Sequence, residues 1–143
     1  MSFSSSLIVK RLEGDKWEVM APLTYYLDNA AYEFIVIHKG FVTDFGSMPF
    51  PFSRIFLPLG KSYDQATVLH DCLYWLPVVW SRSALPGVDA TARTISRGEA
   101  DRIFLDAMAS SKTPFTVRQS LYAGVRLGGW KPWNKYRREN IID

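Results

Sequence analysis

The chain has 143 residues, of which 48% are hydrophobic, 15% aromatic and 22% charged, and its net charge is +3. This length suits a single domain, 1–143, and the small net charge gives no strong signal for nucleic-acid binding. The only cysteine, Cys72, excludes an internal disulfide framework and a zinc cluster built from cysteines.

No targeting or membrane-spanning segment is predicted. The start, MSFSSSLIVKRLEGD, lacks a basic stretch followed by an apolar core, so we expect no signal peptide. No apolar run approaches the roughly 20 residues that span a bilayer. We therefore expect synthesis in a reducing cytoplasm and no transmembrane segment.

Residues 1–50 are predicted to be mainly β. The strongest strand is 32–38, which is rich in β-branched and aromatic side chains. The turn residues 13–15 separate two shorter strands, and a proline-containing loop follows the last one. The shorter strands are predicted at 7–12, 17–20, 24–27 and 41–45.

Residues 62–128 change to a helical period and are predicted to be mainly α. Ser62 is expected to cap a helix over 63–76, which ends at Pro77. Residues 81–95 are predicted to form a loop. Ser96 and Glu99 form a capping box before a helix over 97–111.

Thr113 is expected to cap a third helix, with Pro114 as its first residue, and this helix is expected to end near Leu127, before two glycines. The layout predicts an α+β fold, with a small N-terminal antiparallel β-sheet followed by a three-helix C-terminal part. Residues 129–143 form a basic, aromatic tail. It could bind a phosphate, an anionic envelope polymer or a partner protein, or its aromatic side chains could fold back on the domain.

The stretch LHDCLYWL, residues 69–76, places a histidine and an aspartate in an apolar run, although burying either side chain costs free energy without a partner. His70 and Tyr74 are four apart and share a helix face. Asp101 lies beside the apolar stripe of the next helix. We expect Asp101 to accept a hydrogen bond from His70, leaving the other ring nitrogen as a base. A purely structural role for the pair is the alternative.

A divalent metal, calcium or zinc, is the expected cofactor, and no organic cofactor is expected. Asp71 and Asp44 are the candidate ligands, because carboxylate oxygens suit hard cations. Asp44 could equally cap its loop through backbone N–H groups. Thr43, Ser47 and Trp75 are the candidate substrate-binding residues. Ser47 as a nucleophile is the weaker alternative, because the stretch lacks a G-x-S-x-G elbow.

The pair HDCLY and ADRIF resembles the catalytic helix pair of the secreted and parvoviral phospholipases, and the lead-in YDQATVLHD is similar to that of the viral members. The resemblance implies that His70 activates a water molecule and that Asp71 binds calcium. It also implies that Tyr74 and Asp101 hold the histidine. The glycine-rich calcium loop and the disulfides of that family have no clear counterpart here.

A second resemblance covers most of the chain. GFVTDFGSMP, AxxLHDCLY and SRGEADRIFLDAM are similar to a phage and prophage family of uncharacterised small proteins. This resemblance implies a phage origin and a sheet-plus-helices fold. It implies no particular activity.

The first functional hypothesis is a small phage-encoded hydrolase that acts on a bacterial cell-envelope component, either a peptidoglycan peptide or a lipid ester. Such a protein would be made in the host cytoplasm and then act within a virion or at the envelope. The second is a non-enzymatic virion protein of the tail or baseplate, or an accessory binding protein, whose His/Asp cluster is structural. A third is a factor that binds a host protein or a nucleotide.

Overall fold

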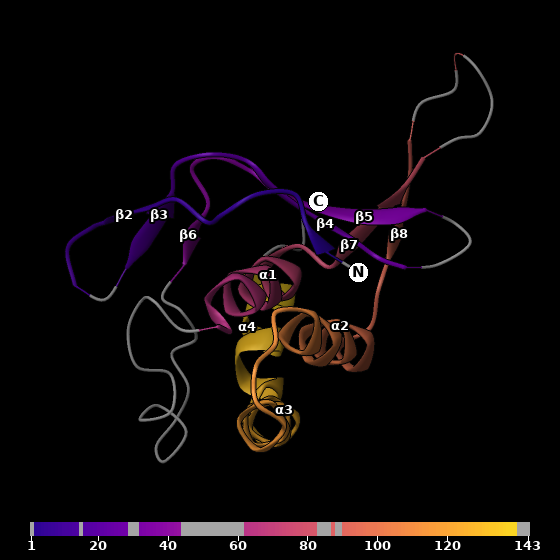
Figure 1. Cartoon of the computed structure of the whole chain (residues 1–143). Coiled ribbons are helices and arrows are strands. Elements are labelled where there is room, and N and C mark those ends of the chain that lie inside the picture. Colours follow the sequence, from indigo (N-terminus) through magenta and orange to yellow (C-terminus); the bar gives the residue numbers. More distant parts are fainter. Residues whose placement is uncertain are drawn as a thin grey trace.

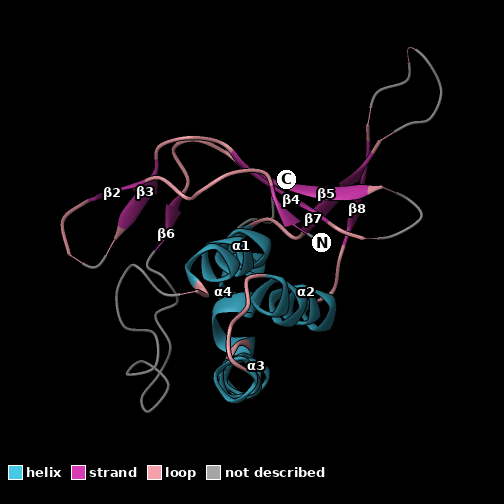
Figure 2. Ribbon diagram, viewed as in Figure 1, coloured by secondary structure: helices cyan, strands magenta, loops and turns pink. Residues whose placement is uncertain are grey.

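The computed structural model describes residues 2–14, 16–28, 32–43, 62–82, 87 and 90–139. Within these ranges most strands precede the helices, and the sheets form one layer above the helical part (Figures 1 and 2). The predicted α+β fold is confirmed.

The strands form two antiparallel sheets. The larger has the order β1-β4-β5-β7-β8 and consists of β1 (Ser2–Phe3), β4 (Leu23–Tyr26), β5 (Glu33–Ile37), β7 (Val78–Ser81) and β8 (Thr91–Thr94). The smaller has the order β2-β3-β6 and consists of β2 (Val9–Arg11), β3 (Trp17–Val19) and β6 (Val42–Thr43).

Strand β5 is the central strand of the larger sheet. Its side chains alternate, so that Ile35 and Ile37 are buried while Phe34 and Val36 are only half-buried. It pairs with β4 on one side and with β7 on the other. This period of two, with one face turned to the helices, is the pattern expected of a half-buried strand.

The loop predicted over 81–95 is wrong at both of its ends, because Ser81 ends β7 and Thr91–Thr94 form β8, and the two strands pair antiparallel. All four residues of β8 are exposed, so this edge strand carries no apolar alternation that a sequence pattern could reveal. Its backbone pairs with β7, and Arg93 forms ion pairs with Glu33 on β5 and with Glu99. Main-chain hydrogen bonds and charge, not hydrophobic burial, hold this strand.

The described part of the chain contains four helices: α1 (Asp64–Trp75), α2 (Arg97–Ser110), α3 (Phe115–Gly128) and α4 (Trp130–Glu139). Helices α1 and α2 pack beneath the larger sheet, and α3 lies farthest from it (Figure 1). One core cluster joins these layers, including Ile35 from the sheet, Leu69 from α1, Phe104 from α2 and Leu121 from α3. Helix α1 is buried around most of its circumference, which explains its nearly continuous apolar sequence.

The helix starts confirm one predicted cap and correct two others. The Ser96 hydroxyl accepts a hydrogen bond from the Glu99 N–H, as the capping box predicts. Ser62 caps no helix; its hydroxyl donates to Thr113 Oγ1 at 3.2 Å. Helix α3 has Pro114 as its N-cap and no side-chain cap bond. The two expected caps therefore tie the starts of α1 and α3 to each other.

The tail forms a fourth helix, α4, where only three helices were expected. Pro132 lies in the first turn of α4, where a missing backbone N–H costs little. The Trp133 ring packs edge-on against Tyr74, with centroids 5.2 Å apart. The aromatic side of the tail therefore folds back on the domain, as one of the two alternatives anticipated.

Candidate functional site

The candidate site is centred on α1, where consecutive residues face different neighbours. Side chains one position apart on an α-helix are rotated by about 100°, so His70 and Asp71 cannot share one set of contacts. His70 faces α2, whereas Asp71 faces β6.

Asp101, on α2, is the hub of the first side. It is fully buried, and its Oδ1 accepts hydrogen bonds from His70 Nε2 at 2.7 Å and from the Tyr74 hydroxyl at 2.6 Å. The structure thus brings together the three residues predicted as catalytic. Their spacing on two amphipathic helices was sufficient to predict the contact.

Two arginines that the sequence analysis did not single out complete the cluster. Arg126 Nη1 on α3 donates to Asp101 Oδ2 at 2.7 Å, and Arg97 Nη1 donates to the same oxygen at 3.3 Å. Arg97 precedes Asp101 by four residues, a spacing that could have indicated the pair. No local pattern indicates Arg126, which reaches the site from another helix.

These contacts set the protonation states. Burial alone would raise the pKa of Asp101, but the hydrogen bonds from His70, Tyr74 and Arg126 outweigh it and lower that pKa. Burial lowers the pKa of His70, against the opposing effect of Asp101. Near neutral pH the site therefore holds a carboxylate and a neutral imidazole. Because the carboxylate accepts at Nε2, the imidazole proton lies there and Nδ1 carries a lone pair.

The His70 ring is fixed by packing as well as by its hydrogen bond. Its centroid lies 4.2 Å from the Tyr74 ring and 4.6 Å from the Phe104 ring. Within the described ranges, no hydrogen bond reaches His70 Nδ1. The His70 side chain is only 9% exposed, so its ring has a fixed orientation and little contact with bulk solvent.

Tyr74 is held against the start of α4 by an unusually close approach. A Cβ atom built at Gly129 would overlap both the Tyr74 hydroxyl oxygen and the Val125 backbone carbonyl oxygen, so no side chain fits at that position. Burial, reinforced by the hydrogen bond to Asp101, raises the pKa of Tyr74 and keeps its hydroxyl protonated as a donor. Gly129 has ordinary helical angles, so this close contact, not a helix stop, explains the glycine.

Helix α4 also closes the C-terminal end of α1. Arg137 Nη2 donates to the backbone carbonyls of Tyr74 and Trp75 at 2.6 and 3.0 Å, and the guanidinium stacks over Trp133 at 4.5 Å. Two carbonyls that an α-helix end leaves unsatisfied therefore have a cationic donor. Burial lowers the pKa of Arg137.

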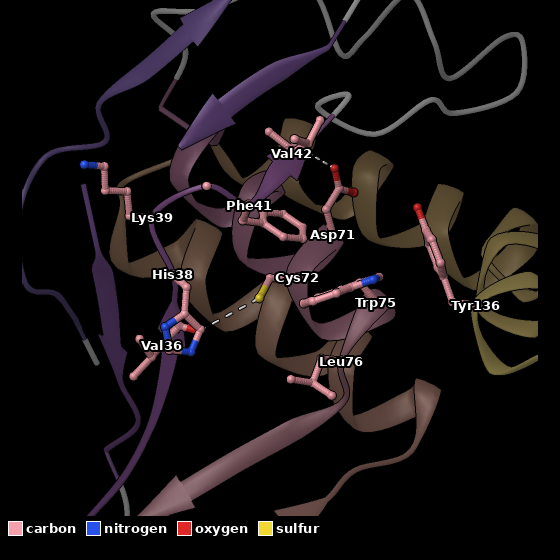
Figure 3. Close-up of a pocket in the computed structure, with 12 residues that line it drawn as sticks. Val36, His38, Lys39, Phe41, Val42, Asp71, Cys72, Trp75, Leu76 and Tyr136 are labelled. Carbon is pink, nitrogen blue, oxygen red and sulfur yellow. Dashed lines mark hydrogen bonds between the residues drawn. The ribbon is translucent and has the colours of Figure 1, made fainter. Parts of the chain in front are cut away.

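The other side of α1 lines a pocket of about 460 Å³ between β5, β6 and α4 (Figure 3). This volume is in the range of small-molecule sites. The Trp75 indole and the His38 imidazole lie on opposite sides of the Cys72 thiol, and Phe41 packs 5.7 Å from Trp75. Most of the lining is apolar: Val36, Phe41, Val42, Cys72, Trp75 and Leu76.

Asp71 and Thr43 form the polar end of this pocket. The Thr43 hydroxyl donates to Asp71 Oδ2 in a short hydrogen bond. Burial, with the Asp71 charge next to it, raises the pKa of the Cys72 thiol to about 12, so Cys72 is a protonated core residue. The pocket offers oxygen ligands at one end, and elsewhere a mostly apolar surface that also includes the His38 and Lys39 side chains.

The predicted site residues thus divide into two groups on one helix. His70, Tyr74 and Asp101 form the buried cluster, and Thr43, Asp71 and Trp75 line the pocket. The remaining predicted residues, Asp44 and Ser47, lie outside the described residues. Within the described ranges, no three His, Cys, Asp or Glu side chains are placed to hold a metal ion.

Together, the fold and the site define an α+β protein with a buried His–Asp–Tyr cluster between two helices. A family model described as "Protein of unknown function (DUF1353)" matches residues 17–125, and the chain belongs to this family. The matched range contains α1 and α2 with the whole His–Asp–Tyr cluster. The expectation of an uncharacterised family is confirmed.

No curated protein and no solved structure matches the chain. Within the part of the chain that the structure describes, every helix is too short or too polar to cross a bilayer.

Proposed function

We propose that this protein is a small hydrolase in which His70 acts as the general base and Asp101 orients it. The observation that carries the proposal is the buried 2.7 Å contact between His70 Nε2 and Asp101, which leaves Nδ1 as the basic atom of a neutral imidazole. A base with this tautomer, held by a carboxylate, is the arrangement that activates a nucleophile near neutral pH.

The proposed reaction is hydrolysis of an ester. His70 Nδ1 takes a proton from water as the oxygen attacks the carbonyl carbon, and the imidazolium then returns the proton to the departing alcohol. Asp101 stabilises the transient imidazolium and does not itself take the proton. Tyr74, Arg97 and Arg126 keep the carboxylate ionised and in place.

A lipid ester of the bacterial envelope is the substrate that the pocket supports best. The pocket begins at Asp71, one residue along α1 from His70, and most of its lining is apolar. Because His70 is not among the lining residues, the proposal requires the scissile ester to reach Nδ1 from the Asp71 end of the pocket. A peptidoglycan peptide would need several partners for its backbone amides, whereas an acyl chain needs apolar surface. The sequence resemblances to phospholipases and to phage proteins favour the same substrate and a phage origin.

A divalent cation held by Asp71 is part of the proposal. Asp71 and Thr43 supply oxygen atoms, the ligands that calcium prefers, and Asp44 follows Thr43 directly in the sequence. Such a cation would polarise the ester carbonyl. The reaction described above assigns every proton transfer to His70.

The test is release of fatty acid from phosphatidylglycerol vesicles, with and without calcium or zinc, alongside release of peptides from peptidoglycan. We expect activity on the vesicles, and a loss of at least about 100-fold in His70→Gln. Asp106→Asn, which changes another carboxylate of the Asp101 helix, is the matched control and should retain activity. Melting temperatures identify variants that fail to fold. Hydrolysis of neither substrate, or full activity in a folded His70→Gln variant, would overturn the proposal.

A non-enzymatic role as a virion component of the tail or baseplate, or as an accessory binding protein, is the second candidate. It is favoured by the extent to which Asp101 is satisfied, with four donors on two oxygens, and by the aromatic packing of His70. In that case His70→Ala lowers the free energy of unfolding by about 1–3 kcal/mol and no substrate is turned over. Presence in purified particles would identify a virion component.

A further inference from the structure

We propose that the outer surface of α3 and α4 binds an anionic lipid bilayer. The α3–α4 surface is defined here as the exposed side chains of residues 112–139, chiefly Lys112, Phe115, Leu127, Trp130, Lys131 and Arg138. This inference stands independently of the proposed hydrolase.

The first observation is the segregation of charge. Residues 112–139 contain seven Lys and Arg and a single carboxylate, Glu139, whereas the rest of the chain contains ten Lys and Arg and thirteen Asp and Glu. The small net charge of the whole chain therefore conceals a strongly basic end. Figure 1 shows α3 at the end of the molecule away from the sheets.

The second observation is the exposure of large apolar side chains within the same region. Leu127 is 70% exposed, Phe115 64% and Trp130 50%. Exposed apolar residues are ordinary when scattered among mixed charges. Here they stand in a region with seven cations and one carboxylate, which is the composition of surfaces that lie in a bilayer interface.

The third observation is that both exposed aromatic rings carry a cation. Arg118 lies 5.2 Å from the Phe115 centroid, and Lys131 lies 5.5 Å from the Trp130 centroid. A ring at the depth of the headgroups with a cation beside it can contact acyl chains and phosphates together. Single-stranded nucleic acid would need open ring faces for base stacking, and one face of each ring is already covered.

Four of the seven cations have hydrogen-bond or ion-pair partners within the protein. Arg126 binds Asp101, and Arg137 binds the carbonyls at the end of α1. Arg118 donates to the Thr113 carbonyl, and Lys135 pairs with Glu139. Lys131 and Arg138 are exposed, lie seven residues apart on one side of α4 and form no ion pair among the described residues. They are the cations to test, because reversing their charge leaves the buried contacts intact.

The experiment is flotation with vesicles of phosphatidylglycerol and phosphatidylcholine in equal parts, against vesicles of phosphatidylcholine alone. The wild type should float only with the anionic vesicles and should dissociate as salt is added. Lys131→Glu/Arg138→Glu should weaken binding on the order of tenfold or more. Lys16→Glu/Arg82→Glu makes the same change in net charge at exposed sites outside the α3–α4 surface, and should bind like the wild type.

A second variant tests the apolar contribution. Leu127→Ser/Trp130→Ser keeps every charge and should weaken vesicle binding several-fold. Thermal melts confirm that each variant is folded, and the assay uses His70→Gln in parallel so that hydrolysis does not affect binding. No binding to anionic vesicles, equal losses in both charge variants, or preferential binding to a single-stranded oligonucleotide would each overturn the proposal.

Discussion

The two sides of α1 differ in how their polar groups are satisfied. On the His70 side, a fully buried carboxylate receives four donors and the site is closed by aromatic rings. On the Asp71 side, a half-buried carboxylate shares a short hydrogen bond with Thr43 and borders an open pocket. Two adjacent residues of one helix, His70 and Asp71, therefore have different surroundings. The first side fixes the orientation of the His70 ring, and the second side borders a pocket of about 460 Å³.

The largest expected effect on stability follows from removing Asp101, the carboxylate that accepts the hydrogen bonds of the buried side. Asp101→Ala leaves two arginines, an imidazole and a phenol without their shared acceptor, and should lower the free energy of unfolding by about 3–5 kcal/mol. Urea denaturation measures the change. Asp106→Ala, on the same helix, should cost less than about 1 kcal/mol. Similar losses of unfolding free energy in the two variants would show that the contacts of Asp101 do not stabilise the fold more than an ordinary surface carboxylate does.

Gly129→Ala tests whether the buried side needs its close contact with α4. The added methyl group would meet the Tyr74 hydroxyl and the Val125 carbonyl oxygen, so Tyr74 or the junction of α3 and α4 must shift, at about 1–3 kcal/mol. Gly98→Ala is the matched control. Its new methyl group would lie no closer than 3.7 Å to its nearest neighbour, and alanine favours the helix by up to about 1 kcal/mol. A neutral Gly129→Ala would contradict the packing described here.

Acid should destabilise the buried side in two stages. The pKa of His70 is lowered below 6.5 by burial, so the unfolded state binds a proton first and stability falls as the pH drops from about 6.5 toward the folded pKa. The pKa of Asp101 is lowered below 3.8, so its contribution is lost only below that pH. Melting temperatures across this range should show both stages in the wild type.

The first stage is assigned by substitution. His70→Gln should remove the fall that begins near pH 6.5 and leave the stage below pH 3.8, since its amide does not titrate. A variant that retains the first stage would place the titrating group elsewhere.

The smallest effect is expected on the pocket side. Thr43→Val removes the donor to Asp71 at nearly constant volume and should cost about 0.5–1.5 kcal/mol, because water can reach the half-buried carboxylate. Thr94→Val, on the exposed strand β8, should be close to neutral. A loss of unfolding free energy in Thr43→Val as large as that in Asp101→Ala would show that the two sides of α1 stabilise the fold equally.

Much of the buried side could be predicted from sequence because its contacts follow helical spacing. His70 and Tyr74 are one turn apart, and Asp101 interrupts the apolar stripe of α2, so their meeting required only that two helices pack. Arg126 and Arg137 reach the site from separate helices, and no spacing within one helix encodes such contacts. The strand β8 could not be predicted for a related reason. Backbone pairing produces no alternation of apolar and polar residues in the sequence of a strand that buries no side chain.

The ion pairs of Arg93 have a consequence for how the molecule responds to salt. Strand β8 has no buried side chain, and Arg93, whose side chain is 45% exposed, connects it to the buried Glu33 and to Glu99 in ion pairs that dissolved ions can screen. In the Asp101 cluster the carboxylate is fully buried and His70 is nearly so, although the Arg126 side chain is 38% exposed, so added salt weakens its contacts less. High ionic strength should therefore speed amide hydrogen exchange in Thr91–Thr94 while the amides of α1 exchange as slowly as before. The edge of the larger sheet would then loosen without any opening around His70.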